Sequence, residues 1–541
     1  MVWRRIVAGL LVVAGAGIAR ASEVRTAAFG GIEGAVADEA TDFNLFNAGN
    51  AAGLVLLERG NRLDYALGRN ASLTRRVDND GITTVTATDS AGFLGSPGGM
   101  YEGLQFWFSD ADALSVSAAF SSVREVYSLF PEPPPQPAPG PPLDTLLPAV
   151  PSGDQQVDVG DGRITVGYAH RFGETLALGI GLAPVKGTLT PKKQDKVKTD
   201  KTEISLFDYQ LGLAARLPLG SGTLQLGLNA RPYDDLPDLE QLAGSPAELS
   251  SLGTPAAFGG LKVKRTFATD SGASQVTELT PDGRRIGLQA AWGGEGPWSA
   301  RVGVDLTSAS VKERVDTDTS SLPAPLNTLT KVDEGDASKY SRFAWDLGLR
   351  YRWMFGEDRS VRLGAALAGA PDTTDQLDFP NSTAITKTTT TAPMTASFGV
   401  AYGTGGGLML GLGYALRGDT QKETDPRNAS ATPVITKPAG TRLMLGVEDW
   451  FTRQWAGRIG LTLASDQVDD NDPSTPAPGT SEKNPTTKAT LISLGGGYRG
   501  TMFSVDALLS FGSPVQQPTP TAPATLTMNV STFALAGKYS F

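Results

Sequence analysis

The feature that most constrains this chain is a long series of short segments in which apolar and polar residues alternate. Such alternation is typical of β-strands, because successive side chains of a strand point to opposite faces. We count about eighteen such segments of roughly nine to fifteen residues, the length that a strand needs to cross a membrane within a barrel. Clear examples are RITVGYAHRF (163–172), SLFDYQLGLAARL (205–217), SRFAWDLGLRYRWMF (341–355), RLMLGVEDWF (442–451) and KATLISLGGGYRG (488–500).

The connections between these segments alternate strictly between short turns and long polar loops. The longest loop is expected from about Arg231 to Gly283, and another contains the proline-rich stretch 130–142. A transmembrane barrel sorts its connections in this way, with short turns on the periplasmic side and long loops outside. The short turns are expected at 109–112, 171–174, 218–222, 293–297, 354–358, 403–407, 451–454 and 498–501.

The C-terminal residues STFALAGKYSF carry the same alternation to the end of the chain. Phe533, Leu535, Tyr539 and Phe541 form an apolar row, with Gly537 in the same row. The last strand of a barrel has to pair with the first, because an open sheet edge cannot be satisfied in lipid. A terminal Phe after alternating apolar residues also resembles the signal read by the outer-membrane barrel-assembly machinery, which we therefore expect as a partner.

The N-terminal residues indicate export across a membrane. Arg4 and Arg5 precede the apolar stretch 6–18, and a small-x-small site predicts cleavage near Ala21. The chain has no Cys, which excludes disulfides and a lipid-modified cysteine, and it has no other apolar run long enough for a transmembrane helix. Its formal net charge of −10 argues against nucleic acid as a partner.

Tryptophans gather beside the expected short turns. Aromatic rings prefer the boundary between membrane and water, so we expect one girdle of Trp side chains at the periplasmic rim. Its expected members are Trp107, Trp292, Trp298, Trp353, Trp450 and Trp455. These observations predict an all-β, transmembrane antiparallel barrel of about 18 strands, with 14–18 plausible, over residues 61–541, in contact with outer-membrane lipid.

Charged residues share the other face of several predicted strands. Each Arg would cost about 2–4 kcal/mol in lipid near the membrane midplane, and each Asp somewhat less, so these side chains are expected to face the lumen. They either form paired charges that stiffen the wall or a constriction that filters solutes. The lumen candidates are Asp208, Arg216, Arg301, Asp305, Arg342, Asp346, Arg350 and Arg352.

Residues 22–60, between the signal peptide (1–21) and the first strand, do not alternate like a strand. Within them, GAVADEATDFNLFNAGNAAGL (34–54) resembles the N-terminal hatch of the long-chain fatty-acid outer-membrane transporters. Ala51 stands where that family has Pro, and the family's barrel has fewer strands than we count here. The resemblance implies a plugged barrel that passes hydrophobic molecules, with hatch or ligand residues Asp38, Phe43, Leu45, Phe46, Asn50 and Gly53.

Other chemistry is weakly indicated. The single His, His170, lies beside a short turn, and the acidic clusters 78–81 and 469–472 are typical of solvated turns. We therefore expect no enzyme activity, no metal site and no cofactor.

Three functions stay open at this point. The first is passive uptake of hydrophobic or amphipathic small molecules through a hatched barrel. The second is a general diffusion porin, favoured by the polar lumen, and the third is a scaffold for secretion or surface assembly that transports nothing. The position of residues 22–60 distinguishes an open porin from the other two. The solute and the oligomeric state are not indicated by the sequence.

Overall fold

The structure is a computed structural model. It describes residues 25, 50–55, 61–79, 82–91, 98–128, 154–191, 197–232, 262–269, 274–294, 296–320, 330–369, 372–378, 385–424, 434–471, 482–483, 487–513, 515–516 and 525–541. The predicted signal peptide and the proline-rich stretch lie outside these residues.

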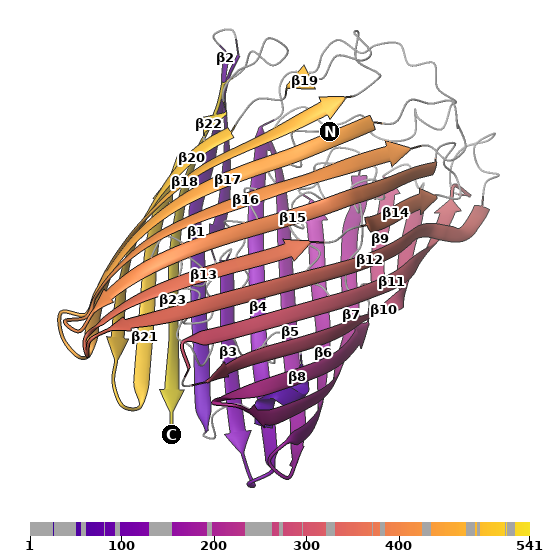
Figure 1. Cartoon of the computed structure of the whole chain (residues 1–541). Coiled ribbons are helices and arrows are strands. Elements are labelled where there is room, and N and C mark those ends of the chain that lie inside the picture. The colour runs from indigo at the N-terminus through magenta and orange to yellow at the C-terminus, as the bar shows by residue number, and fades with distance from the viewer. Residues whose placement is uncertain are drawn as a thin grey trace.

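All described strands belong to one sheet of 23 strands (Figure 1). The strands are β1 (Arg62–Asn79), β2 (Ile82–Ala91), β3 (Gly98–Trp107), β4 (Asp112–Ser128), β5 (Asp154–Phe172), β6 (Leu176–Pro191), β7 (Val197–Leu219), β8 (Gly222–Pro232), β9 (Lys262–Thr269), β10 (Ser274–Gly294), β11 (Trp298–Asp318), β12 (Thr330–Phe355), β13 (Arg359–Gly369), β14 (Asp372–Asp378), β15 (Ile385–Thr404), β16 (Leu408–Thr424), β17 (Val434–Asp449), β18 (Trp455–Asn471), β19 (Glu482–Lys483), β20 (Thr487–Arg499), β21 (Phe503–Gly512), β22 (Val515–Gln516) and β23 (Thr525–Ser540).

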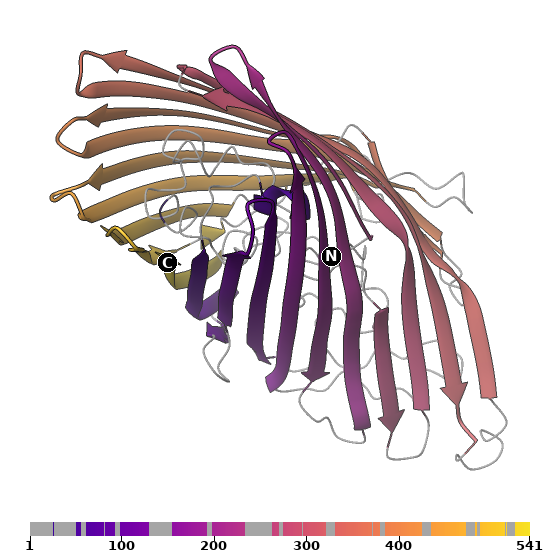
Figure 2. The same ribbon diagram turned by 90° about the horizontal axis from the view of Figure 1, so that it is seen from below.

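Antiparallel pairing orders these strands in a ring, as the view from below shows (Figure 2). Five positions of the ring each hold two strands in succession, namely β2 with β3, β8 with β9, β13 with β14, β19 with β20, and β21 with β22. Because 23 strands with five shared positions occupy eighteen positions, the predicted number of about 18 agrees with the described ring.

The first and last strands close the ring. β1 pairs with β23 from Arg62 opposite Ser540 to Asp78 opposite Thr525. Beyond the last strand, the Phe541 N–H donates to the Asn61 carbonyl at 3.1 Å. The seam satisfies the backbone groups that an open edge would leave unpaired, as spanning lipid requires. The prediction that the C-terminal strand pairs with the first is therefore confirmed.

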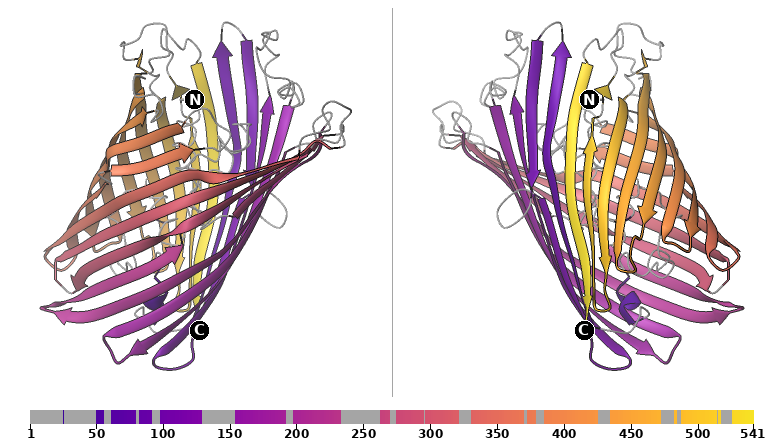
Figure 3. Two further views of the ribbon diagram at one scale, coloured as in Figure 1. Left: turned by 90° about the vertical axis from the view of Figure 1, so that its right-hand side faces the viewer. Right: turned by 90° about the vertical axis from the view of Figure 1, so that its left-hand side faces the viewer.

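The eight short turns lie between the strands where the sequence predicted them, and the C-terminus lies at this end of the barrel (Figure 3). Gly173 and Gly220 have φ values of 63° and 61° in two of these turns, a conformation that Gly adopts without steric cost. One predicted loop was too long. The range 231–283 includes β9 and the first part of β10, because the chain returns to the sheet after residue 261.

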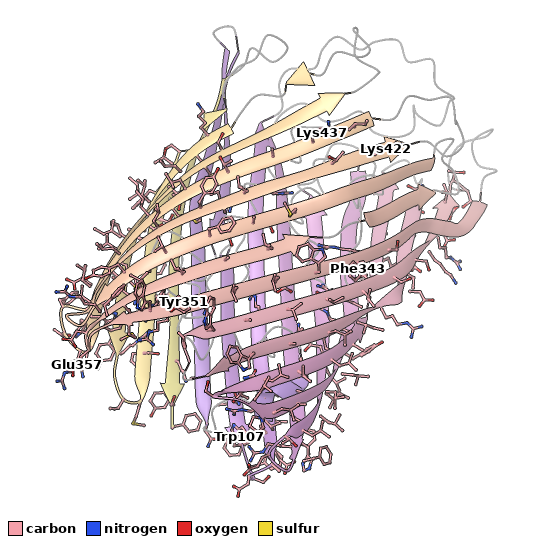
Figure 4. The ribbon with its side chains drawn as sticks, viewed as in Figure 1. Trp107, Phe343, Tyr351, Glu357, Lys422 and Lys437 are labelled. Carbon is pink, nitrogen blue, oxygen red and sulfur yellow. The ribbon has the colours of Figure 1, made fainter. Side chains whose placement is uncertain are left out.

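The outer surface of the sheet is apolar. On β12, Phe343, Leu347 and Leu349 are each at least 40% exposed, whereas Gly348 between them is buried. Figure 4 shows these outward side chains along the strands, with Phe343 and Tyr351 on β12. A continuous outer band of exposed Leu, Val, Ile and Phe is what lipid contact requires and water disfavours. The architecture is that of an outer-membrane barrel.

No helix in the described part of the chain has the length and apolar character to cross a membrane.

The expected tryptophan girdle is only partly correct. Trp298, Trp353 and Trp455 are about half exposed near the short turns. Trp107, at the end of β3 (Figure 4), instead packs inward against the cluster around Ala52. The Trp450 indole N–H donates to the carboxylate of the buried Glu448 at 3.0 Å. An apolar cluster on the inner wall thus holds the Trp107 ring, and a buried carboxylate holds the Trp450 ring, so two of the six rings face away from lipid.

Candidate functional site: the inner wall and the docked N-terminal turn

A short segment from before the first strand is docked inside the barrel. Ala51–Val55 form a 3₁₀ turn, η2, in which Ala52 and Val55 are almost fully buried. The turn contacts β4, β5, β6 and β7 near the end that carries the short turns. A buried turn on the inner face of the sheet occupies space that would otherwise belong to the lumen.

The wall beneath this turn is built from the smallest side chains. Ala113, Ala169, Ala177 and Ala214 are buried together with Ala52 and Val55 in one apolar cluster. Gly179 on β6 and Gly212 on β7 lie so close that an added Cβ would overlap the turn, at the Ala51–Ala52 backbone and at Asn50 Oδ1 respectively. We call the wall formed by these four alanines and two glycines the seat.

Asn50 joins the turn to two strands at once. Its Nδ2 donates to the carbonyls of Leu213 on β7 and Leu228 on β8, at 3.2 and 3.3 Å. Its Oδ1 accepts the Ala52 N–H at 3.1 Å. Because Asn50 is only 3% exposed, these bonds satisfy an amide that burial would otherwise penalise.

A glutamine of the wall completes the docking. Gln105 on β3 donates to the Leu54 carbonyl at 3.1 Å. It is 4% exposed and lies in the inward row of its strand, next to the outward Leu104 and Phe106. Its position in an otherwise apolar-looking strand end is the signal by which the sequence could have shown it.

Two of the predicted hatch residues lie in this site. Besides the contacts of Asn50, the Gly53 N–H donates to the Asn50 carbonyl at 3.0 Å and so closes the turn. Asp38, Phe43, Leu45 and Phe46 lie outside the described residues. The range 22–60 as one hatch, and any ligand role of these six residues, stay predictions.

Several predicted lumen charges form ion pairs on the wall between β10 and β12. Arg285 donates to Asp305 at 3.0 Å, and Arg301 lies 3.5 Å from Asp346. Gly287, Gly303 and Gly348 lie under these side chains, where an added Cβ would meet the charged groups. The charges therefore lie flat along the wall over glycines, a geometry that suits stiffening.

The other predicted lumen charges are less informative. Arg216 and Arg342 are exposed, and Arg350 and Arg352 are half-buried. Asp208 lies in β7, but its side chain is outside the described part of the structure. A filtering role for any of the eight stays a prediction.

The most buried charges were not found from the sequence. Glu448 on β17 accepts two bonds from Arg25, at 2.6 and 2.8 Å, and one from Arg458 on β18 at 2.6 Å. Arg458 also donates to Asp506 on β21 at 2.5 Å. The Arg458 side chain is 0% exposed and that of Glu448 is 1% exposed. We call these four residues the ionic cluster.

Glycine again makes this arrangement possible. The Arg458 guanidinium reaches Asp506 by passing over β20 at Gly497, where a Cβ would lie 2.6 Å from the Arg458 Nη2. The sequence signal was therefore present as three consecutive glycines at 495–497 and as charges at inward positions near short turns. It carried no indication that Arg25 would be the partner, because the contact joins residues far apart in the chain.

His170 has a structural partner on the neighbouring strand. Its Nδ1 lies 2.7 Å from Asp112 Oδ1, and the same carboxylate accepts bonds from Ser109 and Tyr168. Ser109 bonds to the carboxylate and not to the imidazole, so the four side chains are not arranged as a nucleophile with its base. They tie β4 to β5 beside a short turn. Among described residues, no group of three or more potential ligands could hold a metal ion.

Comparisons with known proteins returned structures only. No family model and no curated protein matches the sequence. Similar solved structures include a TodX monoaromatic hydrocarbon channel deltaS2 mutant, with 13% identity and a TM-score of 0.38 over 96% of this chain and 98% of that chain. The Ralstonia pickettii toluene transporter TbuX has 12% identity and a TM-score of 0.32, over 97% and 98%.

A Pseudomonas aeruginosa FadL homologue is similar at 13% identity with a TM-score of 0.35, over 97% of this chain and all of that chain. The TM-scores of these three matches are too low for the superpositions to carry an argument. The fold therefore rests on the strand pairing and the outer apolar band, and the site on the contacts described above.

Proposed function

We propose that this chain is an outer-membrane channel for the passive uptake of hydrophobic or amphipathic small molecules, with residues 22–60 acting as an internal hatch. The proposal is carried by one observation, the burial of Ala51–Val55 on the seat. A diffusion porin gains nothing from a segment bound to its inner wall by buried packing and by hydrogen bonds from Asn50 and Gln105.

The chemistry of the wall supports this choice. A channel for apolar solutes needs little free passage for ions, and a docked hatch removes that passage. Solutes would pass through a minor conformation in which the hatch has shifted. The solute favours this conformation because it binds it more tightly than the closed one. The pairing of Arg285 with Asp305 and of Arg301 with Asp346 suits a stiff wall better than an ion filter.

The general diffusion porin stays the second candidate, because the inner wall carries many charges and the ring is wide. Conductance in planar bilayers separates the two functions. The wild-type protein should show small and infrequent currents. Deletion of residues 26–56, with the signal peptide kept, should raise the conductance and weaken uptake of a hydrophobic probe such as toluene into intact cells.

A control separates this effect from damage to the barrel. The deletion variant should keep the gel shift on heating that marks a folded barrel, at wild-type levels. Large, stable and ohmic wild-type currents would reject the channel in favour of the porin. If neither conductance nor uptake responds to the deletion, a scaffold for secretion or surface assembly becomes the better reading.

A further inference from the structure

The ionic cluster holds the N-terminal segment at a second place, separate from the seat. Arg25 contacts β17, whereas the turn Ala51–Val55 contacts β4 to β7. In the ring of eighteen positions, β6 and β17 are nine positions apart in either direction. The two attachments thus lie on opposite walls of the barrel, both near the short-turn end.

The two attachments differ in chemistry. The seat is apolar and fits the turn by shape, with a few neutral hydrogen bonds. The ionic cluster contains two arginines and two carboxylates and is almost dry, with Arg25 8% exposed and Asp506 7% exposed. Removal of one member of such a cluster leaves an uncompensated buried charge, which is far more costly than loss of a surface ion pair.

The wall residues are arranged around Arg25 and not only around one another. Glu448 accepts two hydrogen bonds from Arg25, in the bidentate geometry that suits a guanidinium. Trp450 and Arg458 hold the same carboxylate in place. The Arg458 and Arg499 guanidiniums lie 5.9 and 4.8 Å from the centre of the Trp450 ring, which fixes the indole.

From this geometry we propose that Glu448, held by Arg458 and Trp450, is a docking site for Arg25 that latches the N-terminal segment to the barrel wall. The latch and the seat then fix the N-terminal segment at opposite walls. The latch rests on the ionic cluster alone and does not require the proposed transport function. For the proposed transport function, the latch is a defined contact that has to break before the N-terminal end can move away from the barrel wall.

Trypsin tests the latch at Arg25 itself, because the protease cleaves after arginine only where the backbone can enter its active site. In folded wild-type protein in detergent, the bond after Arg25 should resist cleavage. In Glu448→Gln it should be cut at least about tenfold faster, since an opening that costs about 1.4 kcal/mol less is populated tenfold more often. Mass spectrometry of the intact protein detects the loss of the residues up to Arg25.

The matched control is Asp449→Asn, which removes a carboxylate from the next, exposed residue and should leave the rate unchanged. Trp450→Phe keeps an aromatic ring but removes the indole N–H and its 3.0 Å bond to Glu448, so it should accelerate cleavage by a smaller factor. This variant also decides the question if Glu448→Gln fails to fold. Equal rates of cleavage after Arg25 in wild type, Trp450→Phe and every foldable Glu448 variant would overturn the latch. It would also be overturned if folded wild-type protein were cleaved there as fast as protein unfolded in urea.

The outcome is independent of the bilayer experiment. Protection of Arg25 that depends on Glu448 supports the latch even if deletion of 26–56 leaves conductance unchanged. The converse result would support a hatch without a latch.

Discussion

Gly179 lies directly beneath the peptide bond that joins Ala51 to Ala52, with no room for a side chain between the barrel wall and the docked turn. An alanine at this position would place its Cβ within the atoms of that peptide. Overpacking of this kind typically costs about 1–3 kcal/mol, and the turn can relieve it only by moving off the seat. The fit of the docked turn therefore depends on the absence of a side chain at position 179 of β6.

Gly179→Ala should loosen the turn without unfolding the barrel. We expect amide hydrogen exchange in the peptide that covers 50–55 to become about tenfold faster or more. Gly181→Ala is the matched control on the same strand face, because its Cβ would lie at ordinary contact distances of 3.5 Å from Gln210 and 3.9 Å from Ala51. Similar exchange rates in the two variants would show that the seat does not hold the turn.

Asn50→Asp should release the same turn through its polar contacts. The change keeps the size of the side chain but replaces the amide donor with an acceptor, which then faces the carbonyls of Leu213 and Leu228. Loss of hydrogen bonds at a buried group costs about 1–3 kcal/mol. Exchange at 50–55 should rise, while the peptides of β10 to β12 stay as in wild type. An unchanged rate at 50–55 would contradict the bridging role of Asn50.

Asp346→Asn tests whether the ion pairs on the wall matter to ions. Because Arg301 and Asp346 are 34% and 41% exposed, the pair should contribute no more than about 1 kcal/mol to stability. In the variant that lacks residues 26–56, however, the lost negative charge should shift the reversal potential in a salt gradient toward anions. Asp449→Asn, which removes an exposed carboxylate beside the short turn after β17, is the control with the same change of charge. Equal reversal potentials in the two variants would assign the wall charges to stiffening alone.

Cysteine labelling tests the orientation of the barrel in a chain that has no native cysteine. A Cys placed within 233–261 should react with a membrane-impermeant maleimide in intact cells, because the long connections are expected outside. Glu357→Cys, in the short turn between β12 and β13 (Figure 4), should react only after the outer membrane is disrupted. The reverse pattern would invert the proposed topology.

Much of this fold could be predicted because its rules are local. Alternation along each strand and the length of each connection decide strand, face and turn one segment at a time, so the ring of strands and its eight short turns were accessible from the sequence. Asn50 could be singled out only through a family resemblance, which did not say what it contacts. The ionic cluster was not, because Arg25 meets Glu448 across 423 positions of the chain. Trp107 was misassigned for the same reason, because its contact with Ala52 joins segments far apart in the chain. Trp450 was misassigned although its partner Glu448 is only two residues away, because both side chains lie on the inner face of the wall.

The last prediction separates the two roles proposed for the C-terminal residue. Phe541 follows the end of β23, its side chain is 53% exposed, and its ring centre lies 5.9 Å from that of Tyr539. Its N–H reaches Asn61 through the backbone, which a substitution keeps. Phe541→Asp should therefore change the stability of the closed barrel little, and purified protein should refold into lipid vesicles to nearly the wild-type yield. In cells the same variant should reach the folded, heat-modifiable form several-fold less, if the barrel-assembly machinery reads the terminal aromatic.

Phe541→Tyr keeps an aromatic ring and should assemble normally. Equal losses in vesicles and in cells would assign Phe541 to closure of the seam, and wild-type levels of Phe541→Asp in cells would remove it from both roles.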